Sequence, residues 1–586
     1  MIEAWNPDDP WPNGCRELLI VGPPGTGKTR TVLDRYVWPV IEAGGIVLAT
    51  SFTRAAAGEL RDRTGARFGR DPSEYREALT TIHSEANRRC RHLGLRFSKR
   101  QAEKQATGAE GDGEMDWAAV LQRLEDKSET DFGRAWDFVR HVWPEDAGKN
   151  PRDRLARIVY GSQLALATAQ VEMDLRARLD ESGALVNPDF TGLLELALTQ
   201  GSDKAVDLLA IDEAQDLSPL QWALMDRWAT RARRVLVVGD PDQAIYGWAG
   251  ADGKRLLSWI RAGRPCRRLA KSWRVPRLAH AIARDTIRLV IDREDAPYLP
   301  ADRDGEVLRR EPSEAWGLAS SEQEAERSVL VLSRTVAGCG QAVSELLGDG
   351  IPHIAERGRR ILDLHGKLLR IAAAAMAWAY RGSADLECAR ALVDALAAKG
   401  SVLRPEGARV VKAHVQATLR DYDRETVPWA WCEAAGLGPG LSVLRRQVDT
   451  PTSEWWAQAL LASHVGDLDA LLTVLDWLQV YGSRAALLDV AQKVVVTTAH
   501  GAKGREADLV VLDARASISF RQRVGSGAIE VQTIEERIAE DLRVLYVAIT
   551  RTKGSLVVIR GFGKRPDWLS THGITIGKIA LYAHGD

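Results

Sequence analysis

Short runs of apolar residues that end in glycine or acidic side chains recur along the chain. Such runs, rich in β-branched residues and bounded by polar ones, are typical of strands buried in a parallel sheet. In the first half they are 17–21 (ELLIV), 206–211 (VDLLAI) and 235–239 (VLVVG). The second half contributes 329–332, 351–354, 494–497, 509–512 and 556–559. The pattern therefore predicts buried strands in both halves of the chain.

Between these runs, apolar residues recur with a period near 3.6, which predicts helices. The helical stretches are 116–124, 132–142 and 158–179, and the Gly/Glu-rich stretch 108–114 is expected to be a loop. The longest apolar run, 371–380, is about half of the ~20 residues that a membrane span needs. We interpret it as a buried helix, and Trp455, Trp456 and Trp477 as helix-packing residues.

Composition and charge narrow the class of protein. Hydrophobic residues make up 45% and charged residues 27% of 586, which excludes a disordered, collagenous or coiled-coil chain. The 79 basic and 80 acidic residues give a net charge of −1, so a polyanionic partner must be held by a local groove. Six scattered cysteines support neither a zinc site nor a disulfide framework. With no signal-like N-terminus, we expect a reduced, cytoplasmic protein with no membrane partner.

A complete GxxxxGK[ST] pattern follows the first apolar run. Glycine-rich loops of this kind wrap a triphosphate with backbone N–H groups at a helix N-terminus. Lys28 is expected to reach the β- and γ-phosphates, and Thr29 to bind Mg²⁺. A chance match is disfavoured by the strand before the loop. The predicted ATP-binding residues here are Gly22, Pro23, Pro24, Gly25, Thr26, Gly27, Lys28, Thr29 and Arg30.

Two carboxylates follow the strand 206–211. Because parallel strands bind ligands at their carboxyl ends, Asp212 is expected to hold Mg²⁺ through water. Glu213 is expected to orient and deprotonate the attacking water. Gln215 of the same DEAQD segment is assigned to the nucleotide site. The alternative, a solvated acidic loop, is disfavoured by the buried strand and the phosphate loop.

A third polar segment, DPDQAIYGWAGAD, follows the strand 235–239. Gln243 can sense the γ-phosphate, and Tyr246 and Trp248 lie in the same short segment. Phosphate sensing and base stacking could thus be linked mechanically. Taken in isolation, Trp248 is more often a core or interface residue.

These motifs, in this order, resemble the UvrD/Rep-like branch of the superfamily 1 helicases. The resemblance implies contacts with single-stranded DNA at Phe52, Thr53, Thr81, His83, Tyr246, Trp248 and His500. It also implies that Trp273 stacks on adenine, that Arg274 and Arg551 reach the phosphates from a second lobe, and that Glu506 contacts the ribose. Both arginines are expected in an open cleft. ATP and Mg²⁺ are the implied cofactors.

The implied architecture is α/β, with two RecA-like P-loop lobes that each carry a mainly helical insertion. The first lobe is expected over residues 1–89 and 187–250, with its insertion at 90–186. The second is expected over 251–357 and 492–586, with its insertion at 358–491.

The implied activity is ATP-driven 3′→5′ movement on single-stranded DNA with duplex separation. The partners are single-stranded DNA and duplex junctions, and the expected state is a monomer or weak dimer. Two departures stand out: no glutamine precedes the phosphate loop, and 560–565 yields no recognisable strand-separating pin. A translocase that strips bound protein without efficient unwinding, and an ATP-gated DNA-binding module, therefore remain alternatives.

Overall fold

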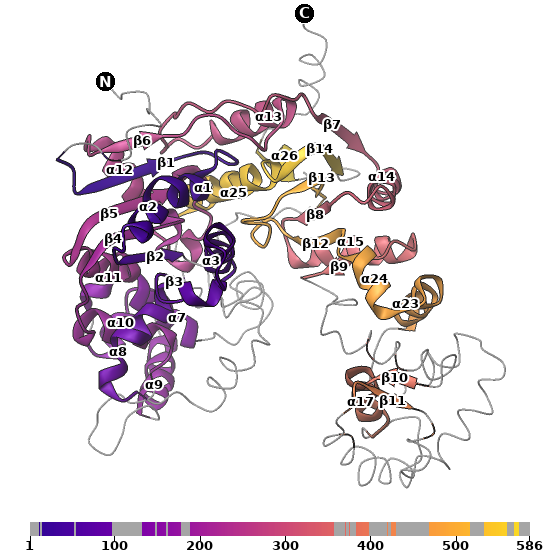
Figure 1. Cartoon of the computed structure of the whole chain (residues 1–586), viewed down its shortest axis with the longest axis horizontal. Helices are drawn as coiled ribbons and strands as arrows, with labels where there is room; N and C mark the ends of the chain where they lie inside the picture. The colour runs from indigo at the N-terminus through magenta and orange to yellow at the C-terminus, as the bar shows by residue number, and fades with distance from the viewer. Residues whose placement is uncertain are drawn as a thin grey trace, which may run out of the picture.

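The computed structural model contains two six-stranded, all-parallel sheets in separate lobes (Figure 1). A small antiparallel pair of strands forms a third sheet. The structure describes residues 11, 14–51, 54–95, 132–146, 149–159, 162–176, 188–356, 370, 374, 383–397, 419, 424–428, 430, 468–515, 533–559 and 568–572.

The first sheet has the strand order β3-β2-β4-β5-β1-β6. Its strands are β1 (Glu17–Val21), β2 (Val47–Ser51), β3 (Leu79–Thr81), β4 (Val206–Ile211), β5 (Ala232–Gly239) and β6 (Cys266–Arg268). Alternate residues of each strand face opposite sides of the sheet. Apolar side chains on both sides pack against helices, so both faces are buried. One face is covered by α1 (Lys28–Val32), α2 (Trp38–Glu42) and α3 (Arg54–Phe68). The other is covered by α4 (Ile82–Arg89), α10 (Phe190–Gln200), α11 (Pro219–Ala229) and α12 (Lys254–Arg261).

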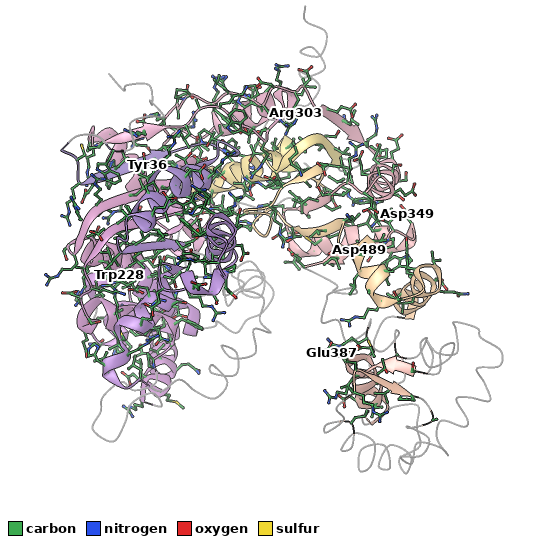
Figure 2. The ribbon with its side chains drawn as sticks, viewed as in Figure 1. Tyr36, Trp228, Arg303, Asp349, Glu387 and Asp489 are labelled. Atoms are coloured by element: carbon green, nitrogen blue, oxygen red, sulfur yellow. The ribbon has the colours of Figure 1, made fainter. Side chains whose placement is uncertain are left out.

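Large aromatic side chains mark the two layers of this lobe. Tyr36 packs edge-on against Trp11 on one face, and Trp228 lies buried on the other beneath the guanidinium of Arg89 (Figure 2). The helices α7 (Phe132–Val142), α8 (Pro151–Leu155) and α9 (Ser162–Arg176) form the described part of the first insertion and share a small core of their own. The helix predicted at 132–142 is thus present, and the one predicted at 158–179 is present over Ser162–Arg176, whereas 108–124 lies outside the described residues.

The first lobe extends beyond the predicted boundary at residue 250. β6 pairs in parallel with β1, and Leu256 of α12 is buried in the same core. The predicted boundary lies too early because β6, at 266–268, is short and carries two arginines, so it gives no apolar signal in the sequence.

The second sheet has the order β7-β14-β13-β8-β12-β9. Its strands are β7 (Glu306–Arg310), β8 (Val329–Ser333), β9 (Ile354–Ala355), β12 (Val494–Thr498), β13 (Ala507–Asp513) and β14 (Thr552–Ile559). One face packs on α14 (Pro312–Glu324), α15 (Val336–Gly348), α23 (Leu468–Tyr481) and α24 (Arg484–Ala491). The other packs on α13 (Arg277–Ile287), α25 (Ile534–Ile549) and α26 (Trp568–Thr571).

The second insertion is shorter than predicted, because α23 and α24 belong to the core of the second lobe. Trp477 and Leu487 are buried there with the sheet residues. Within the second insertion, β10 (Ser383–Asp385) pairs antiparallel with β11 (Thr426–Pro428) beside α17 (Leu386–Ala397). Most of 371–380, Trp455 and Trp456 lie outside the described residues. Among the described helices, none is long and apolar enough to cross a bilayer.

Candidate active site

The phosphate loop connects β1 to α1 and has the backbone conformation of an anion cradle. Gly25 (φ 74°) and Gly27 (φ 79°) adopt left-handed conformations that disfavour any residue with a Cβ. The amine of Lys28 donates a hydrogen bond to the Gly22 carbonyl at 2.7 Å. Arg30 is exposed and pairs with Asp34 one turn along the helix. The loop therefore presents its N–H groups and one ammonium group to the space that a triphosphate would fill.

A hydroxyl and a carboxylate meet beside this loop. Thr29 Oγ1 donates to Asp212 Oδ2 at 3.3 Å. Burial and the neighbouring Glu213 carboxylate raise the pKa of Asp212 to about 7, against the opposing charge of Lys28. Hydroxyl and carboxylate oxygens are the donors that Mg²⁺ prefers. This donor set fits the predicted magnesium ion, whose charge would favour the ionised form of Asp212.

Glu213 follows β4 with a left-handed backbone (φ 53°), which is uncommon for a residue other than glycine. Burial alone would raise the pKa of Glu213, but the charges of Lys503 and Lys28 outweigh it and lower that pKa. The Gln215 amide donates to Glu213, while its carbonyl oxygen accepts from the backbone N–H of Asp240 at 3.0 Å. Glu213 is therefore an ionised and oriented carboxylate, the state that a general base requires.

Gln243 lies between groups from both lobes. Its amide donates to Asp240 Oδ2 at 2.6 Å, and its carbonyl oxygen accepts from the guanidinium of Arg551 at 3.2 Å. Lys503 of the second lobe donates to the Gln243 backbone carbonyl at 3.2 Å and forms an ion pair with Asp216. Burial and Asp242 raise the pKa of Asp240 to about 6. The segment after β5 is thus held by cations of the second lobe.

Arg551 is buried, with 2% of its surface exposed. It donates to the carbonyls of Val547 (2.9 Å) and Arg505 (3.4 Å) as well as to the side-chain carbonyl of Gln243 (3.2 Å). Burial and the charge of Arg274 lower the pKa of Arg551 to about 9. The expectation of an open cleft is therefore wrong for this arginine, because the end of α25 turns directly into β14 and encloses its side chain.

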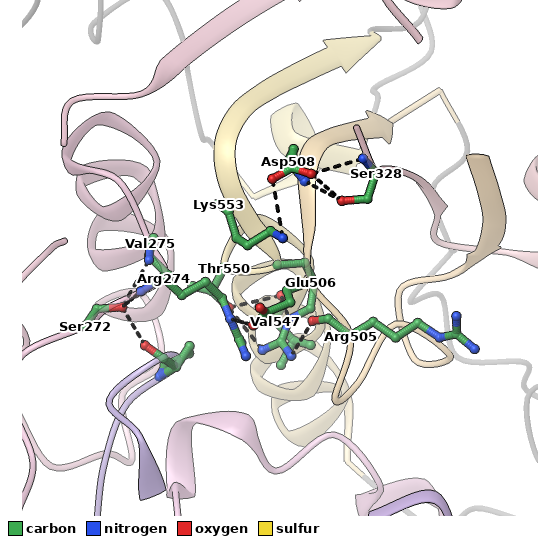
Figure 3. Close-up of polar contacts among 12 residues, drawn as sticks. Ser272, Arg274, Val275, Ser328, Arg505, Glu506, Asp508, Val547, Thr550 and Lys553 are labelled. Carbon is green, nitrogen blue, oxygen red and sulfur yellow. Dashed lines mark hydrogen bonds and ion pairs between the residues drawn. The ribbon is translucent and has the colours of Figure 1, made fainter. Parts of the chain in front are cut away.

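Trp273 and Arg274 lie against the phosphate loop. The backbone N–H of Trp273 donates to the Gly25 carbonyl at 2.8 Å, and its ring is 70% exposed. Arg274 Nε donates to Glu506 Oε2 at 2.6 Å (Figure 3). The structure thus brings together the residues predicted for base stacking, phosphate and ribose contacts, and leaves an aromatic face open beside the loop.

Three residues predicted to contact nucleic acid form a ring cluster where the lobes meet. The ring of His500 lies 6.3 Å from that of Tyr246 and 6.1 Å from that of Trp248. Burial and the charge of Arg334 lower the pKa of His500 to about 3, so the ring is neutral at ordinary pH. Trp248 is half-buried rather than a core residue.

Two other predicted DNA contacts, Thr81 and His83, lie elsewhere in the first lobe. Thr81 caps α4 by accepting a hydrogen bond from Ser84 N at 3.3 Å. His83 packs edge-on against Phe190, 5.7 Å between ring centres. Phe52 and Thr53 lie outside the described residues.

Two family models match the chain on either side of the second insertion. The UvrD/REP helicase N-terminal domain matches residues 12–262, and the UvrD-like helicase C-terminal domain matches 462–561. Together these regions cover more than half of the chain. The chain belongs to the UvrD/REP helicase family. The predictions of this family, of its two-lobed α/β fold and of a helicase enzyme are confirmed.

The helicase is similar to proteins of known name along different shares of its length. ATP-dependent DNA helicase UvrD2 of Mycobacterium tuberculosis (strain ATCC 25618 / H37Rv) is 27% identical over 602 residues, which covers 94% of this chain and 77% of the relative. DNA helicase II of Escherichia coli (strain K12) is 27% identical over 258 residues, 42% of this chain and 34% of the relative. ATP-dependent DNA helicase PcrA of Leuconostoc citreum is 28% identical over 264 residues, covering 41% and 33%.

Sequence reasoning gave no role to two residues of the helicase site, Lys503 and Asp240. Asp240 stands directly after β5 as Asp212 stands after β4, so the rule that ligands bind at the carboxyl ends of strands could have found it. Lys503 lies in the same segment as His500, and only the packing of the lobes shows that its amine reaches Asp216 and lies 3.7 Å from Glu213.

Proposed function

We propose that this helicase couples hydrolysis of Mg-ATP to 3′→5′ movement along single-stranded DNA and to separation of duplex at junctions. The observation that carries the proposal is the continuity of two sites. Gln243 shares one short segment with Tyr246 and Trp248, and Lys503 shares another with His500. A change in the γ-phosphate contacts of Gln243 would be transmitted directly to the rings that stack on bases. The named relatives, which are DNA helicases, support DNA as the polymer.

The proposed chemistry divides between the lobes. Bound at Thr29 and, through water, at Asp212, Mg²⁺ would offset the phosphate charge. When ATP binds, the Lys28 amine gives up its hydrogen bond to the Gly22 carbonyl and donates to the β- and γ-phosphates instead. Glu213 accepts the proton of the attacking water, and Arg551 and Arg274 stabilise charge on the γ-phosphate from the second lobe. Because the two walls come from different lobes, closure completes the site and product release reopens it.

The direct test is ATP hydrolysis with and without single-stranded DNA. The proposal predicts strong stimulation by DNA, with an affinity that falls steeply with salt and depends little on sequence. Hydrolysis that is unaffected by DNA would contradict it.

Trp248→Ala is expected to raise the DNA concentration for half-maximal stimulation about tenfold. Base stacking on an aromatic side chain contributes roughly 1–3 kcal/mol, and 1.4 kcal/mol corresponds to a factor of ten. A titration with oligodeoxythymidine measures this, with Trp248→Phe as the control that keeps an aromatic face. If hydrolysis without DNA fell by the same factor, Trp248 would be a structural residue and not a DNA contact.

Duplexes with a 3′ single-stranded tail are expected to be displaced in the presence of ATP and Mg²⁺, and duplexes with only a 5′ tail to be poor substrates. The polarity rests on the family resemblance. Both substrates are compared at one salt concentration, since salt alone changes binding. A preference for the 5′ tail would overturn the direction. Activity on neither tail, with DNA-stimulated hydrolysis intact, would indicate a translocase that does not unwind efficiently by itself.

A further inference from the structure

The C-terminal end of α7, in the insertion of the first lobe, lies against two segments of the motor. His141 Nδ1 is 2.8 Å from Ser218 Oγ, the N-cap of α11, two residues after Asp216. On the other side, a Cβ placed on Gly250 would lie 3.0 Å from Val142 Cγ2. The insertion thus contacts both the turn after the DEAQD segment and the end of the segment that carries Trp248.

These two motor segments are also joined directly to each other. The backbone N–H of Asp252, just beyond Gly250, donates to the Leu217 carbonyl at 2.8 Å. The segment that carries Trp248 is therefore bonded to Leu217, the residue next to Ser218, whose hydroxyl lies against His141.

The hydrogen bonds around His141 run in one direction. Ser218 Oγ accepts from the backbone N–H of Gln221 at 3.3 Å, and its hydroxyl proton remains to be donated. Thr191 Oγ1 donates its proton to Asp137 at 3.0 Å and lies 3.4 Å from His141 Nε2. Every group in the network has a partner when the Ser218 hydroxyl donates to an unprotonated Nδ1 and the Nε2–H donates to Thr191 Oγ1.

This arrangement requires a neutral imidazole with the proton on Nε2. Burial, together with the charges of His83 and Arg140, lowers the pKa of His141 to about 3, against the opposing charge of Asp189. The ring therefore stays neutral at ordinary pH. The chain of hydrogen bonds joins the cap of α11, the insertion helix and α10, and ends on a carboxylate 3.5 Å from Arg140.

We infer that His141 is a positioning residue through which the insertion of the first lobe couples the DNA-contacting segment to the DEAQD segment. Its loss uncouples DNA binding from hydrolysis without removing any group that touches ATP. The inference rests on the proposed DNA-dependent hydrolysis. His141, Ser218 and Thr191 belong to none of the predicted nucleotide or DNA contacts.

The test compares His141→Asn with His141→Gln in the full chain. Asparagine places a carbonyl oxygen near the position of Nδ1 and can still accept from Ser218. Glutamine places its amide near the position of Nε2 and keeps only the side facing Thr191. ATP hydrolysis is measured with and without oligodeoxythymidine, and folding is followed by thermal unfolding. We expect His141→Gln to lower the stimulation by DNA about tenfold, with basal hydrolysis and KM for ATP within about twofold of the unchanged protein. His141→Asn keeps the side facing Ser218 and loses only the side facing Thr191, so it should retain about a third of the stimulation.

The unchanged protein distinguishes the two ways in which the test can fail. Absence of stimulation there would overturn the proposed function itself. Full stimulation in His141→Gln, or a parallel fall of basal and stimulated rates in both variants, would overturn the positioning role alone. Should His141→Gln not fold, Thr191→Val removes the opposite hydrogen bond with little change in volume. It is expected to lower stimulation about threefold, and an unchanged stimulation would overturn the inference.

Discussion

Glu213→Gln is expected to lower kcat for ATP by a factor of roughly 10²–10⁴, the usual contribution of a general base. Nucleotide binding should remain, because the amide has the shape of the carboxylate and the phosphate loop is untouched. The physical basis is that Lys503 and Lys28 keep Glu213 ionised despite burial, and glutamine cannot take up the proton. Steady-state hydrolysis with saturating single-stranded DNA, together with equilibrium binding of a non-hydrolysable ATP analogue, measures both effects.

Lys28→Ala is the matched control for this experiment. It removes the phosphate-facing amine and should abolish binding and turnover together. A Glu213→Gln protein that hydrolyses ATP at the normal rate would show that another group activates the water.

Arg551→Lys is expected to lower turnover by roughly 10³-fold or more, the scale on which arginine fingers act. Lysine keeps the positive charge, but its single nitrogen cannot replace the three guanidinium nitrogens that donate separately to Val547, Arg505 and Gln243. Because the side chain is buried, Arg551→Ala would also leave these acceptors unpaired and destabilise the fold, at about 1–3 kcal/mol for each unsatisfied group.

Arg274→Ala separates the catalytic effect from the structural one. Arg274 is partly exposed and bound to Glu506, so its loss should reduce turnover by a similar factor with little change in the melting temperature. Measurements of kcat and Tm on both variants check this. If Arg551→Lys kept normal turnover while melting at a lower temperature, its role would be structural.

The strands that carry the site were predictable because their signal is local. The strands β1 and β4 have the bounds that their apolar runs indicated; Asp212 and Glu213 follow β4 directly, and Lys28 begins the helix after the loop that follows β1. The burial of Arg551 and the reach of Lys503 were not predictable, since they depend on how α25 and the turn after β12 pack against the first lobe. Likewise, nothing in the periodicity of α7 distinguishes His141 from an ordinary packing residue, because its partner lies 77 positions away in the chain.

The outcomes predicted for Phe52, Thr53 and 560–565 stay predictions, because these residues lie outside the described part of the structure.

The order of strands in the second sheet has a consequence for synthesis on the ribosome. β8 (Val329–Ser333) is paired on one edge by β12, which begins at Val494, and on the other by β13, which begins at Ala507. An apolar strand therefore leaves the ribosome long before either neighbour exists, with both edges able to pair with other chains. The native pairing of β8 with β12 and β13 is slow, because it requires closing the long stretch of chain between them. The nascent chain should consequently depend on chaperones that bind this segment until β12 and β13 have been made.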